Sequence, residues 1–195
     1  MEFTISRGFS DAERPRIAAL YWEAFSAKLS FVMGPQDKAL YFLERQVDPD
    51  YALVARDAGG AVQGLAGFKT AQGALVGGAM SDLVATYGWL SALWRAPLLS
   101  LVERDLSDGV LLMDGICVGV DARGCGLGTA LLQAIKDEAR ARGKTAVRLD
   151  VIDTNPRARA LYEREGFDAI GTETLGPLRP VFGFRSSTRM LFRLT

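Results

Sequence analysis

The sequence of 195 residues contains no histidine. Imidazole is the usual general base near neutral pH and the commonest side-chain metal ligand. Its absence excludes Ser-His-Asp and Cys-His triads, and it excludes zinc sites built on histidine. We therefore predict no metal site, and any catalysis must depend on carboxylates, hydroxyls, lysines, backbone amides or water.

Cysteine is also scarce, with only Cys117 and Cys125 in the chain. Two cysteines so close together support neither a disulfide framework nor a zinc site, and they favour a reducing cytosol. The first residues, Met-Glu-Phe-Thr-Ile-Ser, lack the charged and apolar regions of a signal peptide. We therefore expect residue 1 to belong to the fold of a cytoplasmic protein.

Neither sign of charge is in excess, because 23 Lys and Arg residues balance 23 Asp and Glu residues. Nucleic acids and anionic membranes favour a basic face, which this balance does not indicate. The most apolar stretch, 83–94, is bounded by Asp82 and Arg95 and holds Gly88. It is shorter than the roughly 20 residues of a membrane-spanning helix. The sequence thus predicts neither a nucleic-acid partner nor a membrane span.

The length suits one domain with a sizeable core, since such a chain buries roughly 70% of its unfolded surface. Periodicity, capping residues and turn residues predict helices after Ser10, after Gly34-Pro35, over 127–142 and from Asn155-Pro156 to Gly166. Strands are predicted over 3–9, 51–56, 61–70, 110–118, 146–152, 167–172 and 187–194. This order predicts a mixed α/β sheet with helices on both faces.

The segment 71–108 interrupts this pattern as an insertion between two strands. It begins as a glycine-rich loop and continues as an apolar helical stretch that is expected to break at Pro97, followed by a short amphipathic piece ending near Arg104. The stretch carries three aromatic residues, Tyr87, Trp89 and Trp94. Aromatic residues at helical spacing are usually buried, which favours core or dimer packing. The alternative is a lid or wall over an acceptor pocket.

A glycine-rich turn, 118–129, connects strand 110–118 to helix 127–142. Amides at a helix start are unpaired and lie at the positive end of the helix dipole, and glycines let a phosphate approach them. A pyrophosphate would fit there, although tight packing alone also requires glycines. A nucleoside-triphosphate loop is not indicated, because Thr129 and not lysine follows Gly128. A dinucleotide fold stays open, since Asp150 or Asp153 can loosely serve as its acidic residue.

Two motifs together resemble one family. Arg123-x-x-Gly126-x-Gly128 resembles the turn with which the GNAT superfamily of N-acetyltransferases binds the pyrophosphate of acetyl-coenzyme A. Asn155-x-x-Ala158-x-x-Leu161-Tyr162-x-x-x-Gly166-Phe167 is similar to the second motif of that superfamily. Both lie within residues 110–167, in the family's order. The resemblance implies one GNAT-like domain over 1–195, with a mixed, mostly antiparallel central sheet flanked by helices and an insertion before the cofactor-binding strand.

The resemblance also implies acetyl-coenzyme A as cosubstrate. In that fold the strand before the turn diverges from the next one, which leaves backbone groups of Ile116, Cys117 and Val118 unpaired. The pantetheine arm carries two amides and can pair there like a missing strand. The turn residues expected at the cofactor are Arg123, Gly124, Cys125, Gly126, Leu127, Gly128 and Thr129. Asn155 and Tyr162 are expected beside the pantetheine arm.

Acetyl transfer to an amine needs a neutral amine, a stabilised oxyanion and a proton for the departing thiolate. Tyr162 matches the family tyrosine that donates this proton, although a tyrosine on the inner face of a helix can also be a packing residue. Asp114 is expected to point to the same face as Ile116 and Val118 by strand alternation. We therefore assign Asp114 as base or water-relay anchor, with a hydrogen-bonded carboxylate near a strand break at Gly115 as the alternative.

The two cysteines raise the question of an acyl-enzyme. Cys117 is expected to be a small buried apolar residue, whereas Cys125 occupies a variable position of the turn that bound pyrophosphate would block. Direct attack by the amine is therefore favoured over a covalent route.

The acceptor is expected across the sheet from the cofactor, near the insertion and the last hairpin. The tail 177–185 carries Arg179 and Arg185, and arginine can clamp a carboxylate or phosphate. We favour an acidic small molecule slightly over a peptide amine. The sequence thus predicts an N-acetyltransferase acting on a primary amine; a non-catalytic acyl-coenzyme A sensor is the alternative, and a homodimer through the insertion is compatible with either.

Overall fold

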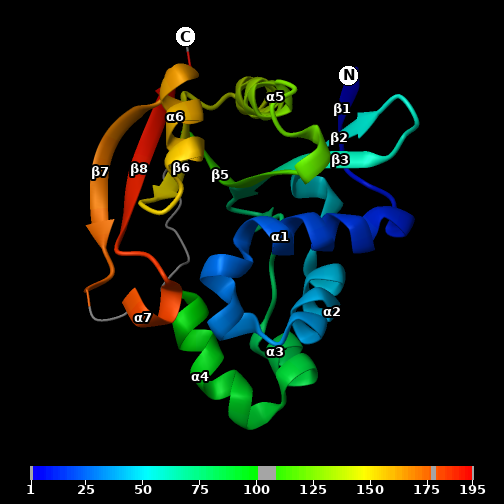
Figure 1. The fold of residues 1–195 in the computed structure, drawn as a ribbon, viewed down its shortest axis with the longest axis vertical. Helices are drawn as coiled ribbons and strands as arrows, with labels where there is room; N and C mark the ends of the chain where they lie inside the picture. The colour runs from blue at the N-terminus through cyan, green and yellow to red at the C-terminus, as the bar shows by residue number, and fades with distance from the viewer. Residues whose placement is uncertain (1, 101–108, 177–178, 195) are drawn as a thin grey trace.

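The computed structural model describes residues 2–100, 109–176 and 179–194. An 8-stranded sheet forms its centre, in the spatial order β1-β2-β3-β5-β6-β8-β7, with β4 paired to β3 (Figure 1). The strands are β1 (Phe3–Arg7), β2 (Ala52–Asp57), β3 (Val62–Thr70), β4 (Gly73–Ala74), β5 (Val110–Val118), β6 (Ala146–Ile152), β7 (Asp168–Thr174) and β8 (Ser186–Arg193). The helices are α1 (Arg14–Met33), α2 (Gln36–Gln46), α3 (Met80–Tyr87), α4 (Trp89–Ser100), α5 (Leu127–Ala141), α6 (Pro156–Arg164) and α7 (Arg179–Phe182).

The sheet is mixed and mostly antiparallel, as predicted. Only β5 and β6 run parallel, and the other described pairs are antiparallel. The β2–β3 hairpin turns at Asp57, whose carboxylate accepts hydrogen bonds from the amides of Gly59 and Ala61 at 2.9 and 3.0 Å. A parallel pair needs a crossover connection, and α5 supplies it between β5 and β6.

Helices cover both faces of the sheet, which confirms the second part of that prediction. Alternate residues of β2 show the division, because Leu53 packs in the cluster that contains Leu131 of α5, whereas Val54 packs with Ile17 of α1. Figure 1 shows α5 and α1 on opposite sides of the sheet. None of the helices in the described ranges combines the length and apolar character that a bilayer crossing requires.

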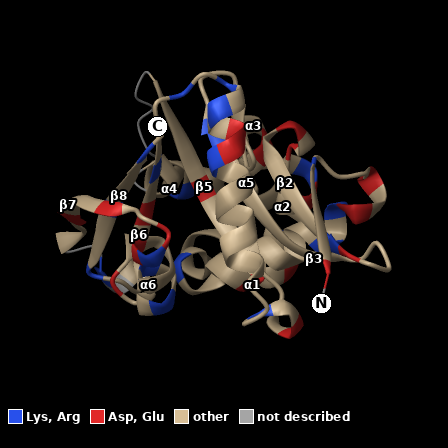
Figure 2. Ribbon diagram, turned by 90° about the horizontal axis from the view of Figure 1, so that it is seen from above, with Lys and Arg blue, Asp and Glu red and all other residues tan. Residues whose placement is uncertain are grey.

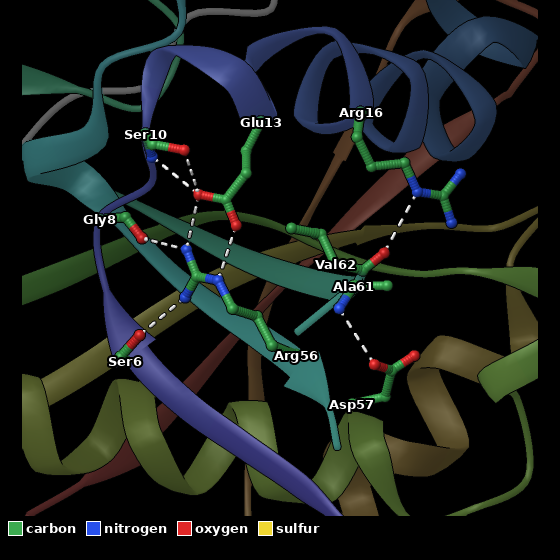
Figure 3. A network of polar contacts seen from close by, with 9 residues as sticks. All are labelled: Ser6, Gly8, Ser10, Glu13, Arg16, Arg56, Asp57, Ala61 and Val62. Carbon is green, nitrogen blue, oxygen red and sulfur yellow. Dashed lines mark hydrogen bonds and ion pairs between the residues drawn. The ribbon is translucent and has the colours of Figure 1, made fainter. Parts of the chain in front are cut away.

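The first helix is tied to the sheet at its start by a polar network (Figure 3). The amide and hydroxyl of Ser10 donate to Glu13 Oε2 at 2.8 and 2.9 Å. The Arg56 guanidinium on β2 donates to both Glu13 oxygens at 2.7 and 3.0 Å, and also to Ser6 Oγ and the Gly8 carbonyl. This network joins β1, β2 and the entry to α1.

The described part of the insertion, residues 71–100, contains two helices, and the predicted break at Pro97 is wrong. The chain breaks at Gly88, whose positive φ of 80° suits glycine, while α4 continues through Pro97 to Ser100. Because Gly88 combines this φ with a ψ of 160°, which is not helical, α3 ends there and the aromatic stretch divides. The predicted amphipathic piece ending near Arg104 lies outside the described residues.

The insertion is attached to the C-terminal end of α1. Tyr87 donates its hydroxyl to the Met33 carbonyl at 2.5 Å, and Arg95 donates to the carbonyls of Val32 and Gly34. The last carbonyls of a helix lack intrahelical partners and form its negative end, so a buried arginine is well placed there. Tyr87 is buried as predicted for core packing, whereas Trp89 is 64% exposed and a dimer through this face stays a prediction.

We expect Glu13→Gln to lower the free energy of unfolding at pH 7 by about 1–3 kcal/mol, because the charge-assisted bonds with Arg56 are lost. Hydrogen bonding from Arg56 lowers the pKa of Glu13 from 4.5 to about 2. The unfolded state therefore takes up the proton first as the pH falls, so this stability is complete above pH 4.5 and disappears towards pH 2.

Urea denaturation at a series of pH values measures this effect, with the exposed Glu2→Gln as control. The difference between wild type and Glu13→Gln should shrink between pH 4.5 and 2. A difference that is constant over that range would contradict the assignment.

Candidate active site

The site forms where β5 separates from β6. The two strands pair only from Val110 to Leu112, opposite Ala146 to Arg148. Beyond that point β6 continues along β8 as far as Ile152, while β5 continues along β3 as far as Val118. A cavity of about 610 Å³ lies at the gap. The divergence that the family resemblance implies is therefore present in the structure.

Most of the predicted cofactor residues surround this cavity. Those that line it are Ile116, Cys117, Val118, Arg123, Gly124, Gly126, Leu127, Gly128, Thr129, Asn155 and Tyr162. Cys125 lies on the same turn, but its exposed side chain is outside the lining. Segments of β5, the glycine turn and α6 thus meet around one space.

The glycine turn has a backbone that requires glycine at two positions. Gly124 and Gly126 have φ values of 82° and 79°, a region that other residues rarely adopt. Gly128 packs closely against α6, because an added Cβ would lie 3.1 Å from Leu161 Cδ2, and Leu161 would have to shift slightly to admit it. The turn therefore brings the first amides of α5 next to α6, and these amides can bind an anion.

Arg123 fastens the turn to two neighbouring elements. Its Nε donates to the Val118 carbonyl of β5 at 3.1 Å, and its guanidinium forms a 2.8 Å ion pair with Glu23 of α1. Both side chains of this ion pair are partly exposed, so it contributes little to stability. Its effect is to hold the turn across the mouth of the cavity.

Asp114 lies at a β-bulge, and the prediction about its direction is wrong. Gly67 pairs with Gly115 and Phe68 pairs with Met113, which leaves Asp114 as the extra residue of β5. An extra residue reverses the alternation of side chains. Ile116 therefore packs towards the α5 face, whereas Asp114 lines a second cavity together with Leu112 on the α1 face.

The second cavity has a volume of about 330 Å³ and lies against α1, α2, α3 and α4. Asp114 lines both cavities, so the two spaces adjoin at this residue. Leu83 of α3 and Leu99 of α4 form part of the wall. The insertion thus supplies part of the wall of this cavity, although Tyr87, Trp89 and Trp94 are not part of it; that the cavity takes the acceptor stays a prediction.

Tyr162 is held by the helix in which it lies. Asn155 caps α6 by accepting the Ala158 amide at 3.1 Å, and Gly166 follows the helix with a φ of 83°. Tyr162 is 6% exposed, packs against Phe167 with ring centroids 6.1 Å apart, and lines the larger cavity. It therefore both packs in the core and contacts the cavity.

Cys117 is an unsuitable nucleophile. Burial, together with the nearby Asp114 charge, raises the pKa of its thiol well above the usual range. Because the thiolate is the reactive form, a thiol in this position stays protonated and inert.

The two arginines of the C-terminal tail lie outside the lining of both cavities. Phe182 and Phe184 are buried against Val32 of α1, with Leu98 and Leu99 of α4 beside them. Arg179 and Arg185 are exposed and line neither cavity. The tail residues that the structure describes pack α1 against α4. The preference for an acidic acceptor therefore gains no support from the tail arginines.

Sequence reasoning missed the part of the lining that comes from α1 and from one face of α6. Arg157, Ala158, Leu161 and Arg164 recur at helical spacing, a signal that could have identified this face. Figure 2 shows the basic residues along α6. Phe25 of α1 had no such signal. Its ring occupies the space that is available because Gly115 has no side chain.

Comparisons with known proteins agree with this arrangement. The family model described as "Acetyltransferase (GNAT) family" matches residues 14–167. A mycothiol acetyltransferase from Beutenbergia cavernae is 40% identical over 91 residues, which cover 40% of this chain and 31% of that protein. The chain thus spans about a third of the length of this relative.

Solved structures share the fold at low identity. A GCN5-related N-acetyltransferase from Kribbella flavida superposes with a TM-score of 0.66 at 23% identity, covering 98% of each chain. A ribosomal-protein-S18-alanine N-acetyltransferase from Escherichia coli gives a TM-score of 0.60 at 18% identity, covering 100% of this chain and 95% of that one. These similarities to solved structures show the fold of this chain.

The contrast between the two thiols can be tested with Ellman's reagent. The native protein should react at Cys125, which is exposed, while Cys117 should react only after denaturation. Cys125→Ser should therefore abolish labelling of the native protein, and Cys117→Ser should leave it unchanged. Rapid labelling of native Cys125→Ser would contradict the burial of Cys117.

Proposed function

Since the chain belongs to the GNAT acetyltransferase family, whose model matches residues 14–167, we propose that it moves an acetyl group from acetyl-coenzyme A to a primary amine by direct attack. The observation that carries this proposal is the cavity at the β5–β6 gap, with the glycine turn at one side and Tyr162 at another. The acceptor amine belongs to a small molecule or a peptide. A cytoplasmic location stays a prediction from the cysteine content.

The lining of the cavity offers backbone groups that suit two parts of acetyl-coenzyme A. The edge of β5 over Ile116–Val118 faces a gap where β6 does not pair with it, and two amides of a pantetheine arm match such an edge. The start of α5, with Arg123, Gly124, Cys125, Gly126, Gly128 and Thr129 around it, offers amides to a pyrophosphate. The Asn155 side chain is engaged in capping α6, so its part is to place that helix beside the arm.

The chemistry is assigned to two side chains of this protein. Acetyl-coenzyme A supplies an activated thioester, and the amine attacks its carbonyl carbon. Tyr162 donates the proton to the departing thiolate from its position on the cavity wall. Asp114, at the junction of the two cavities, accepts the proton of the amine directly or through water. The inert state of Cys117 supports direct attack over an acyl-enzyme.

No observation favours the alternative of a sensor without catalysis. Blockage of the cleft by the aromatic insertion would have favoured it, but the described residues of α3 and α4 line only the smaller cavity. The larger cavity stays open to a cofactor.

Gly126→Asp should weaken coenzyme A binding by about 10–100-fold, because it adds strain and negative charge at the amides of α5. Isothermal titration calorimetry measures the dissociation constant. Gly60→Asp is the matched control, since Gly60 also has a positive φ and open space around it, but lies in the β2–β3 turn. Equal dissociation constants of coenzyme A for the two variants would contradict a role of the glycine turn in cofactor binding.

Tyr162→Phe should lower kcat about 10²–10⁴-fold, the usual contribution of a positioned acid, and should leave the dissociation constant of coenzyme A nearly unchanged. Thiol release in the presence of an amine panel measures the rate. Tyr41→Phe, on the exposed surface of α2, controls for loss of a hydroxyl. An unchanged kcat for Tyr162→Phe would limit that residue to packing.

A further inference from the structure

The smaller cavity has a charged end and an apolar end. Its two charged residues, Lys69 and Asp114, both belong to the sheet, on β3 and β5. The helices contribute a mostly apolar wall that includes Leu29, Met33, Phe42, Met80, Leu83 and Leu99, with Tyr21 and Ser100 as its polar members. A molecule in this cavity therefore contacts charge only where it touches the sheet.

The size and wall of the cavity restrict its occupant. Its volume of about 330 Å³ is at the lower end of ligand pockets, which span roughly 300–1,000 Å³. Leu29, Met33, Phe42 and Leu83 are each at most 6% exposed and offer no hydrogen bonds from their side chains. Hydroxyl or ammonium groups placed against them would lose water without a replacement partner. A compact apolar group gains free energy in the same place.

The position of Asp114 orients such an occupant. Asp114 belongs to the lining of both cavities, so a nitrogen held near this carboxylate lies at the junction with the proposed cofactor cavity. The remainder of the molecule then extends towards α2, α3 and α4. The bulge lies at this junction, because Asp114 is the extra residue of β5 between the pairs Met113–Phe68 and Gly115–Gly67.

We propose that the acceptor is a primary amine carried on a compact apolar group, aromatic or branched aliphatic. This inference rests on the proposed function, because it takes amine acetylation from it and adds the chemistry of the acceptor. A free alkylamine and a peptide whose first side chain is apolar both present this chemistry. Sugars with amino groups and polyamines do not.

An amine panel with acetyl-coenzyme A tests the preference. The apolar members are 2-phenylethylamine, isopentylamine and the peptide Phe-Gly-Gly, and the polar members are glucosamine, spermidine and Gly-Gly-Gly. Thiol release should give kcat/KM values roughly tenfold or more higher for an apolar member than for its polar counterparts. Faster turnover of the two free amines identifies a free alkylamine as the acceptor. Faster turnover of Phe-Gly-Gly identifies a peptide. A preference for the polar members would overturn the inference and leave the proposed function in place.

A cavity-filling variant locates the preference in this cavity. Gly77 lines it, has an ordinary φ, and has open space where a Cβ would be added. Gly77→Leu should lower kcat/KM for 2-phenylethylamine about tenfold or more and should spare methylamine, which needs no apolar space. Gly171→Leu is the matched control, because Gly171 also has open space but lies on β7 outside both cavities.

Two further measurements make the result decisive. If Gly77→Leu melts early, Met80→Lys replaces it, since Met80 is 49% exposed and its substitution adds charge to the apolar wall. If no amine is acetylated, the proposed function fails, and calorimetric titration with 2-phenylethylamine tests the cavity separately. Binding that Gly77→Leu weakens supports the inference. Absence of binding, or equal values for wild type and the cavity variants, overturns it.

Discussion

Backbone hydrogen bonding along β5 is the constraint on which the site depends. This strand pairs with β3 as far as Val118, but with β6 only as far as Leu112. Unpaired backbone groups in a protein interior are costly, so an open edge of this kind suits a ligand that supplies the missing amides. The parallel pair holds the two strands together at one end, and the crossover helix α5 begins after the glycine turn that follows the other end of β5. The limited pairing of β5 with β6 thus accounts for both the arrangement of the strands and the cavity.

The β-bulge at Asp114 changes the direction of the side chains along β5. One extra residue in β5 reverses the alternation of side chains, so Asp114 and Cys117 face the α1 side while Ile116 faces the α5 side. Asp114 lines both cavities. Leu112, two residues earlier, lines the smaller cavity as well, so Asp114 keeps the face of Leu112 and the bulge changes the direction of the residues that follow.

The first helix forms a rigid wall between these features and the insertion. Glu13 and Arg56 fix its start to β2, and Arg95 binds the carbonyls at its end. In the middle, Phe25 packs against the backbone of β5 at Gly115 and lines the larger cavity. Because both ends and the centre are held, α1 can serve as a wall of both cavities.

The sequence by itself determined the order of elements, the mixed sheet with helices on both faces, the glycine turn and the cap at Asn155, because these follow from local periodicity and from residues with special backbone preferences. It also identified the family, whose two motifs are local. Tertiary structure alone decided the direction of Asp114, the break at Gly88 in place of Pro97, and the contribution of Phe25 to the site. Each of these depends on which residue of a distant element lies opposite, and short-range pattern carries no information about that. The burial of Phe182 and Phe184 has the same cause.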